Sequence, residues 1–290
     1  MEHQIKKVII PVAGFGTRFL PATKAQPKEM LPIVDKPVIQ YLVEEAVASG
    51  ITEVIFVTGR GKRAIEDHFD NAGELEYYLE RRGKHELART VRDIAGLARF
   101  AFVRQKEPHG VGDALLQAFH LIGNEPVAVL FGDDVVYSKT PCLKQLMNVF
   151  EKYRNPIIAL ERVPKKLVSR YGVIDGKKVA HKTYSISKIV EKPSVADAPS
   201  NLSVVGKYIL TPSVFEALKR IKPQKNQELY LTDALQSVIT RGEGVHGFEF
   251  SGVRYDCGDK LGLLKAVVDY GLRHPELGSG LRKHLRTVKM

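Results

Sequence analysis

A loop rich in glycine, proline and lysine follows the apolar run at residues 8–10. Residues 11–32 read PVAGFGTRFLPATKAQPKEMLP and carry three cationic side chains, Arg18, Lys24 and Lys28. Glycines let backbone amides approach an anion closely, and the cations attract phosphate. Ordered loops of about twenty residues are usually functional in compact domains. The pattern favours a triphosphate-binding loop over its alternative, a surface lid whose cations are merely solvated.

This loop fits neither of the two best-known phosphate motifs. A dinucleotide fingerprint needs three glycines, and here Gly14 and Gly16 are followed by Phe19 at the third position. A Walker loop ends in Gly-Lys-Ser/Thr, which Gly16-Thr17-Arg18 does not supply. The prolines that follow lack the amide hydrogen that a continuing helix requires. The sequence therefore argues against a nicotinamide site and against a long helix opening directly from the loop.

Acidic side chains stand at the ends of two expected strands. VLFGDDVV places Asp133 and Asp134 directly after a buried strand, and VRYDCGDKLG places Asp256 at the end of another. Ligands of open α/β sheets bind beyond the carboxyl ends of strands, and a carboxylate beside a triphosphate suits Mg²⁺. Asp133 and Asp256 are therefore candidate magnesium ligands, with ordinary turn chemistry as the alternative. Asp259 is better explained as the N-cap of a helix.

The segment KIVEKP places Glu191 and Lys192 at a strand end, just before a proline that stops the strand. Adjacent side chains on a strand point to opposite faces. The strand end must therefore twist if both residues serve one site. Taken alone, such a pair is more often a surface ion pair.

A further segment, VRQKEPHGVGDAL, places Gln105 at a strand end and Gly110 and Gly112 at the entry to a helix. Glutamine and exposed backbone amides together can hydrogen-bond the edge of a nucleobase. A turn with a helix cap at Asp113 explains the glycines nearly as well.

Length and composition predict a soluble globular protein, since the chain has 290 residues of which 44% are hydrophobic. Its apolar stretches are too short to span a bilayer and its N-terminus lacks a secretory pattern, so we expect no membrane association and a cytoplasmic location. Cys142 and Cys257 lack the spacing of a zinc site and are expected to be buried small side chains.

The formal charge of +11 raises the possibility of nucleic-acid binding. The basic residues are spread along the chain, however, with one compact cluster in the tail at residues 273–290. No zinc-finger or RNP-type motif accompanies them. A positive charge suits an enzyme for polyanionic nucleotides equally well, so we expect no nucleic-acid partner and treat such binding as a remote alternative.

Apolar runs alternate with helical patterns, which predicts an α/β fold with a mostly parallel central sheet flanked by helices. The charged stretch 74–94 is expected to form one long exposed helix. From about residue 163, short strands and turns predict a smaller lobe of mixed strands. Expected strands are 7–12, 53–58, 99–104, 126–131, 156–161, 171–174, 186–190, 203–210, 245–250 and 253–256. Expected helices are 38–49, 63–69, 113–121, 143–153 and 260–273, with further helix starts near 211 and 231.

Together, in this order, the motifs resemble the bacterial UTP-glucose-1-phosphate uridylyltransferases, or UDP-glucose pyrophosphorylases, of the sugar nucleotidyltransferase family. The resemblance covers residues 7–274 and rests on PVAGFGTRFLPATKAQPKEMLPIVDKPVIQY, HFD, YGV, VEKP, SNLSVVGKYIL, LTDA and DCGDKLG. It implies a Rossmann-like nucleotidyltransferase fold in a single domain, 1–290. Within it, a nucleotide-binding lobe at about 1–162 and a sugar-binding lobe at about 163–258 precede a helical, basic tail at 259–290.

The resemblance also implies a reaction, in which UTP and glucose 1-phosphate give UDP-glucose and pyrophosphate with Mg²⁺ as cofactor. It implies a homo-oligomer, either a dimer or a tetramer. A thymidylyltransferase or another sugar-phosphate nucleotidyltransferase is the alternative, because a methyl group is worth only about 1 to 3 kcal/mol in a fitted pocket.

Roles for individual residues follow from the same resemblance. The residues expected to bind the nucleotide are Ala13, Gly14, Gly16, Thr17, Gln105 and Gly110. Those expected to hold the reacting phosphates are Arg18, Lys28 and Lys192, those at the sugar are Gly172 and Glu191, and the magnesium ligands are Asp133 and Asp256. No nucleophilic triad is needed, because the attacking phosphate oxygen is already anionic and catalysis consists of positioning and charge stabilisation.

Overall fold

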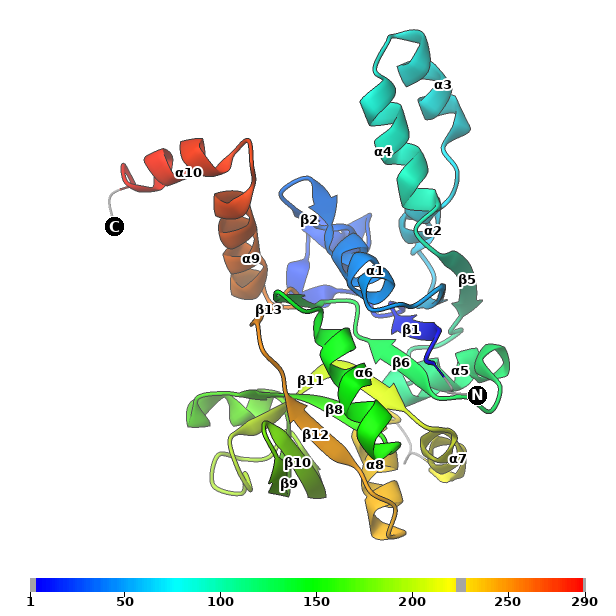
Figure 1. Cartoon of the computed structure of the whole chain (residues 1–290), viewed down its shortest axis with the longest axis vertical. Coiled ribbons are helices and arrows are strands. Elements are labelled where there is room, and N and C mark those ends of the chain that lie inside the picture. Colours follow the sequence, from blue (N-terminus) through cyan, green and yellow to red (C-terminus); the bar gives the residue numbers. More distant parts are fainter. Residues whose placement is uncertain (1–3, 223–227, 289–290) are drawn as a thin grey trace.

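The fold is built on one nine-stranded sheet with the strand order β5-β4-β1-β6-β11-β8-β12-β10-β9. The computed structural model in Figure 1 describes residues 4–222 and 228–288. β10 and β11 run antiparallel to their neighbours and the other strands share one direction, so the predicted mostly parallel α/β sheet is confirmed. The strands are β1 Lys7–Pro11, β4 Glu53–Thr58, β5 Arg99–Arg104, β6 Val127–Leu130, β8 Ile157–Arg162, β9 Gly172–Ala180, β10 Thr183–Glu191, β11 Leu202–Leu210 and β12 His246–Glu249.

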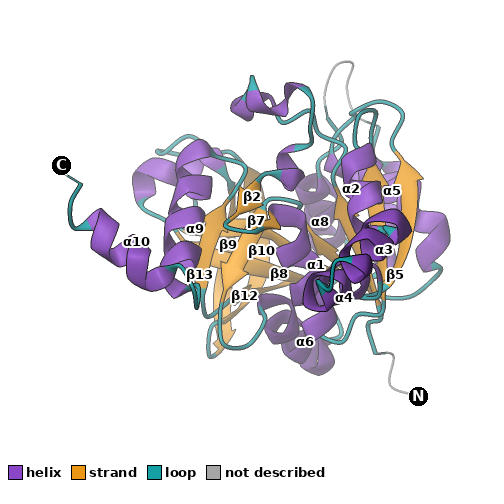
Figure 2. Cartoon of the chain, turned by 90° about the horizontal axis from the view of Figure 1, so that it is seen from above, coloured by secondary structure: helices purple, strands orange, loops and turns teal. Residues whose placement is uncertain are grey.

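Helices cover both faces of this sheet, as Figure 2 shows from above. On β1, Val8 and Ile10 pack into one hydrophobic core with α1, α2 and α6, whereas Ile9 packs into a second core with α5, α7 and α8. Burial on both faces explains why these strands are continuously apolar. The helices are α1 Val38–Ala48, α2 Arg63–Phe69, α5 Val111–Ile122, α6 Cys142–Tyr153, α7 Pro212–Arg220, α8 Leu231–Thr240, α9 Lys260–Arg273 and α10 Gly278–Leu285.

The mixed-strand region predicted from about residue 163 continues the same sheet. β9 and β10 pair antiparallel, and β10 joins the sheet through β12. β11 is buried along its whole length and pairs with β6, β8 and β9. The two halves of the chain are therefore held together by a shared buried strand.

The strand β7, which lies beside the site, was not predicted from the sequence. β7 (Asp134–Tyr137) pairs antiparallel with β13 (Val253–Asp256) in a small sheet of its own, with Asp256 opposite Asp134. The stretch VLFGDDVV had been interpreted as one strand and a following turn, which hid the second strand. This pairing brings the two acidic motifs together.

The prediction of one long helix over 74–94 is wrong. Two helices, α3 (Gly73–Arg81) and α4 (His85–Ala95), form a hairpin that projects from the body in Figure 1. Gly83 between them has a φ of 69°, a left-handed conformation that reverses the chain and that glycine adopts without strain. The side chains of Arg92 and Glu76 then join the two helices by a 2.9 Å ion pair.

The loop at 11–32 is also less extended than predicted. It coils into three short 3₁₀ turns and then enters a small β-hairpin; no long helix opens from it, as expected. The turns are η1 Thr17–Phe19, η2 Ala22–Lys24 and η3 Lys28–Met30, and the hairpin strands are β2 Pro32–Ile33 and β3 Lys36–Pro37.

Several local predictions are confirmed. α7 begins directly after Thr211, and Asp259 caps α9 by accepting the backbone amides of Leu261 and Gly262 at 2.9 and 3.4 Å. Cys142 and Cys257 are buried thiols.

A separate finding concerns helix length and polarity: within residues 4–222 and 228–288, no helix is long and apolar enough to cross a membrane.

Candidate active site

Two cavities adjoin beyond the carboxyl ends of β1 and β6. We call the first the loop cavity; it has a volume of about 270 Å³ and contains the predicted residues Ala13, Gly14, Lys28, Gln105 and Gly110. The second, the strand-end cavity, has a volume of about 260 Å³ and contains Arg18, Gly172, Glu191, Lys192 and Asp256. Asp133 lines both cavities, so they meet at this side chain. Gly16 and Thr17 line neither of them.

A larger hollow, of about 560 Å³, lies elsewhere, between α6 and the turn that joins β9 to β10. Lys152, Tyr153 and His181 are among its lining residues. None of the predicted site residues reaches it. The predicted site residues that line a cavity therefore all line the loop cavity or the strand-end cavity.

Gly16 shapes the loop although it does not line a cavity. Its φ is 67°, and a Cβ built on it would lie only 3.1 Å from Cβ of Lys28. The Thr23 hydroxyl donates to the Gly16 carbonyl at 2.8 Å and closes the turn. The glycine thus lets the start of the loop pack against the backbone that carries Lys28.

At the meeting point of the cavities, the Lys28 ammonium donates to Oδ2 of Asp133 at 2.5 Å. Burial, the largest single influence, raises the pKa of the Asp133 carboxyl, but the charge and hydrogen bond of Lys28, together with the charges of Arg254 and Arg18, outweigh it, so the net pKa lies below its ordinary value. For Lys28, burial lowers the pKa, while the nearby Asp133 and Glu29 carboxylates more than reverse that effect. Both groups are therefore charged at neutral pH.

Beneath this pair lies a second, more deeply buried one. The Lys62 ammonium donates to Oε2 of Glu29 at 2.8 Å, and the two side chains are only 5% and 1% exposed. Burial is the main influence on both groups: it raises the pKa of Glu29 and lowers that of Lys62. This ion pair anchors the residue next to Lys28 to the segment before α2.

Gln105 is held in one orientation in the loop cavity. Its amide nitrogen donates to the Gly110 carbonyl at 3.1 Å and to Oδ2 of Asp113 at 2.6 Å. Both partners are acceptors, so the amide nitrogen must face them and the amide oxygen is left to accept from a ligand. Gly110 has a φ of 98°, and a Cβ there would lie 2.9 Å from the Leu229 backbone, which only glycine avoids.

The strand end at Glu191 and Lys192 contains the twist that a shared site requires. Lys192 has a left-handed φ of 44°, and its ammonium lies 3.4 Å from Oε1 of Glu191. The Thr232 hydroxyl donates to the other Glu191 oxygen at 3.2 Å. A Cβ on Gly172 would lie 3.2 Å from that same oxygen, so glycine leaves room for the carboxylate.

Asp133 and Asp256 converge on Gly258. A Cβ built on Gly258 would overlap Oδ2 of Asp133 and lie 3.1 Å from Oδ1 of Asp256. The Gly258 amide donates to the Asp256 carboxylate at 3.1 Å. Burial, followed by the charge of Asp134, raises the pKa of Asp256. These two predicted metal ligands therefore pack closely around Gly258, where a larger side chain would displace them.

Known proteins are similar to this chain along most of its length. A family model described as nucleotidyl transferase matches residues 7–271. The chain belongs to this family. The UTP–glucose-1-phosphate uridylyltransferase YngB of Bacillus subtilis (strain 168) is 50% identical over 288 residues, which cover 99% of this chain and 97% of that protein.

Two solved structures are similar to this nucleotidyl transferase along almost its whole length. A UDP-glucose pyrophosphorylase complexed with UDP-glucose has a TM-score of 0.86 and 45% identity, and covers 93% of this chain and 100% of its own. A UTP-bound UGPase from Acinetobacter baumannii has a TM-score of 0.91 and 39% identity, and covers 99% of this chain and 100% of its own.

The sequence analysis of this nucleotidyl transferase missed two arginines that line the strand-end cavity. Arg170 donates to Oδ2 of Asp259 at 2.9 Å, and Arg254 has a side chain only 7% exposed. Arg254 stands two residues before Asp256, and alternate residues of a strand share a face, so its position was detectable. Arg170 is 89 residues from its partner, and no local pattern marks it.

Proposed function

We propose that this nucleotidyl transferase moves a uridylyl group from UTP to glucose 1-phosphate, forming UDP-glucose and pyrophosphate. The observation that carries the proposal is that the loop cavity and the strand-end cavity meet at Asp133, with Lys28 in one and Lys192 in the other. The two substrates are anions, and fixed cations offset their repulsion as the sugar phosphate attacks the α-phosphate in line. A relative that is 50% identical bears the name of this activity, and similar structures hold UTP or UDP-glucose.

The loop cavity is suited to the nucleoside. The amide oxygen of Gln105 is oriented to accept the imide N–H of a uracil ring. Ala13, Gly14 and Gly110 line the same cavity and let their backbones approach the base and ribose. Thymine carries the same imide group, so thymidylyl transfer is the alternative to be tested.

The reacting phosphates lie, in this proposal, between cations of both cavities. Arg18 and Lys28 hold the triphosphate, with Gly16 and Thr17 supporting the loop from behind. Lys192 holds the sugar phosphate. Its neighbour Glu191, for which Gly172 leaves room, accepts hydrogen bonds from hydroxyl groups of the sugar. Residues 1–162 thus supply most of the nucleotide side, and residues 163–258 supply the sugar side.

A magnesium ion fits between Asp133 and Asp256. Mg²⁺ prefers oxygen ligands and is commonly bound by one or two carboxylates together with substrate phosphates and water. Asp133 and Asp256 both line the strand-end cavity and so supply the carboxylates of such a site. In residues 4–222 and 228–288, no group of three or more His, Cys, Asp or Glu could hold a metal, and in this proposal substrate phosphate and water complete the ligand set. Bound there, the ion would offset the charge of the triphosphate.

We also propose a cytoplasmic homo-oligomer, either a dimer or a tetramer. The proposed reaction consumes UTP, which is a cytoplasmic metabolite. The projecting α3–α4 hairpin exposes Tyr77 and Leu87, and α10 exposes Leu285, which makes these elements candidate contact surfaces. Light scattering on the purified protein would measure its mass in solution.

Pyrophosphate release tests the proposed reaction directly. The purified protein is incubated with Mg²⁺, glucose 1-phosphate and, in parallel, UTP, dTTP, ATP, CTP or GTP. We expect release chiefly with UTP, abolished by a chelator. A preference for dTTP would retain the site and change the base assignment, whereas no release with any nucleotide would contradict the proposal.

A further inference from the structure

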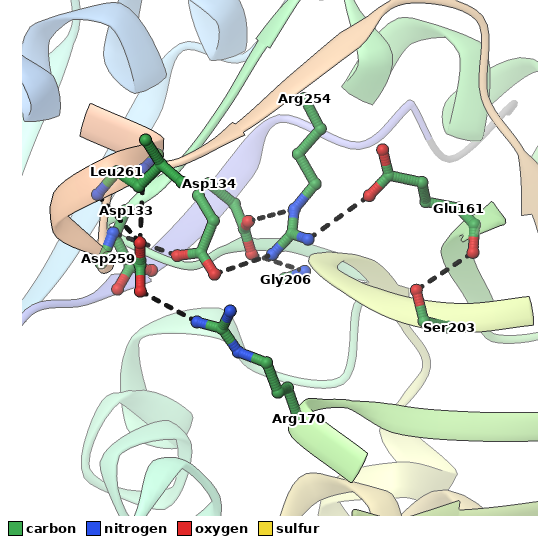
Figure 3. A network of polar contacts seen from close by, with 12 residues as sticks. Asp133, Asp134, Glu161, Arg170, Ser203, Gly206, Arg254, Asp259 and Leu261 are labelled. Atoms are coloured by element: carbon green, nitrogen blue, oxygen red, sulfur yellow. Dashed lines mark hydrogen bonds and ion pairs between the residues drawn. The ribbon is translucent and has the colours of Figure 1, made fainter. Parts of the chain in front are cut away.

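Arg254 lines the strand-end cavity and lies near three carboxylates, of which Figure 3 labels Asp134 and Glu161. Its Nε donates to Oδ1 of Asp134 at 2.5 Å, and its Nη1 donates to Oε2 of Glu161 at 3.4 Å. Its Nη2 lies 3.9 Å from Oδ2 of Asp256. The guanidinium centre also lies 5.1 Å from the ring centroid of Tyr171. A planar fork of donors can meet several carboxylates at once, which a lysine cannot do.

Both oxygens of Asp134 are thereby occupied. Oδ1 accepts from Arg254, and Oδ2 accepts from the backbone amide of Gly206 at 2.9 Å. A Cβ on Gly206 would overlap Oδ2 of Asp134 and lie 2.6 Å from Cβ of Phe131, so only glycine brings this amide so close. Asp134 lines the strand-end cavity beside Asp133, yet it is only 5% exposed and both of its oxygens are already bonded.

Without Arg254, the pairing of β7 with β13 would be electrostatically unfavourable. Asp256 lies directly opposite Asp134 in the register, and like charges in that position destabilise a strand pair. The two carboxylates and the neighbouring Asp133 would then form one cluster of negative charge. Such a cluster attracts a cation, and Arg254 is the cation that the chain itself supplies to two of its members.

We propose that Arg254 is a positioning residue that withholds Asp134 from the metal and leaves Asp133 and Asp256 as its ligands. The inference rests on the proposed function, in which a divalent cation binds at those two carboxylates. Arg254 acts by holding Asp134 against the Gly206 amide and by holding Asp256 next to β7. It touches neither the metal nor the reacting atoms.

The test uses Mn²⁺ binding to the nucleotide-free protein, followed by electron paramagnetic resonance. Arg254→Met releases Asp134, so the affinity for Mn²⁺ is expected to rise by about 5- to 150-fold, the usual range of coupling between two sites. The double variant Arg254→Met with Asp134→Asn is expected to lose this gain. Arg162→Met removes another strand-crossing arginine, bound to Glu249 at 3.1 Å, and is the matched control with unchanged Mn²⁺ affinity.

Either of two results would overturn the inference. A folded Arg254→Met protein with unchanged Mn²⁺ affinity would show that Asp134 is not being withheld. A gain that survives in the double variant would show that the released ligand is not Asp134. If Arg254→Met does not fold, Arg254→Lys replaces it, because one ammonium cannot bridge three carboxylates and the same rise, smaller in size, is expected.

Steady-state values of kcat and KM for the same variants provide a second, independent test. In Arg254→Lys, kcat is expected to fall while KM for UTP changes little, because the ion is drawn toward Asp134 after the nucleotide has bound. An equal loss of folded fraction and kcat would indicate only a structural role and would contradict the inference. Since Mn²⁺ binding needs no turnover, the inference and the proposed uridylyl transfer can fail separately.

Discussion

The ammonium of Lys28 lies 2.5 Å from Oδ2 of Asp133, at the point where the loop cavity meets the strand-end cavity. In the proposed function, Oδ2 of Asp133 also binds the metal ion, and the Lys28 ammonium also binds the triphosphate. The two partners must therefore separate when nucleotide and metal arrive. Until then, Lys28 neutralises Asp133 and competes with any divalent cation for it.

Replacing Lys28 should make this competition measurable. In Lys28→Gln, the nucleotide-free protein is expected to bind Mn²⁺ at least about fivefold more tightly, because the competing ammonium is gone. Isothermal titration with Mn²⁺ alone would measure the change. Lys24→Gln is the matched control, since it removes the same charge from an exposed position of the same loop. Equal Mn²⁺ affinities of Lys28→Gln and the unchanged protein would show that Lys28 does not compete with the cation for Asp133.

Lys192 is expected to be essential for turnover but not for folding. In Lys192→Ala, kcat should fall by about 10²- to 10³-fold, as is usual when one preorganised electrostatic contact is lost. Lys188→Ala, at an exposed position of β10, the strand that ends just before Lys192, should retain its activity. Steady-state kinetics with UTP and glucose 1-phosphate, together with a thermal melt of each variant, would measure both effects. Near-normal turnover in folded Lys192→Ala would remove Lys192 from the site.

The main sheet was predictable from the sequence because alternation, apolar runs and turn residues are local signals. The sequence predicted a twist at Lys192 only if Glu191 and Lys192 serve one site. The φ of 44° at Lys192 supplies that twist. The contact of Arg254 with Asp134 spans 120 positions, and nothing in either local pattern announces it. Likewise, the turn at Gly83 is marked only by one glycine, too weak a signal to divide a charged helical pattern.

His246 should make the folded state sensitive to mild acid. It is 8% exposed, its ring stacks on Tyr153 with a centroid distance of 4.1 Å, and its Nδ1 has no hydrogen-bond partner in the part of the chain that the structure describes. Burial lowers the pKa of the imidazole below 6.5. The unfolded chain therefore binds more protons than the folded chain between that lowered pKa and 6.5, and the unfolding free energy falls as pH drops through this window.

His246→Phe keeps an aromatic ring for stacking and removes the titrating group. The unfolding free energy should then depend less on pH below 6.5, the slope changing by up to about 1.4 kcal/mol per pH unit. Urea denaturation at a series of pH values would measure the slope. His120→Gln, at an exposed position of α5, is the control and should leave the slope as it is. An identical slope in His246→Phe would mean that His246 is not an acid-sensitive group.

Breaking the buried ion pair between Glu29 and Lys62 should lower the stability of the fold. Lys62→Met leaves the Glu29 carboxylate buried without its ammonium partner, and breaking a buried pair in this way costs about 3–5 kcal/mol. Burial already raises the pKa of Glu29 above 4.5, and loss of Lys62 raises it further. The folded variant then holds more protons than the unfolded chain above pH 4.5, so its unfolding free energy falls as pH rises toward neutrality.

The double variant Lys62→Met with Glu29→Met is the control, because it also removes the unpaired carboxylate. It should recover most of the lost stability and lose this pH dependence. Denaturation of both variants at about pH 5 and at about pH 7.5 would measure the difference. A deficit in Lys62→Met that is the same at both pH values would show that the loss comes from packing and not from an uncompensated carboxylate.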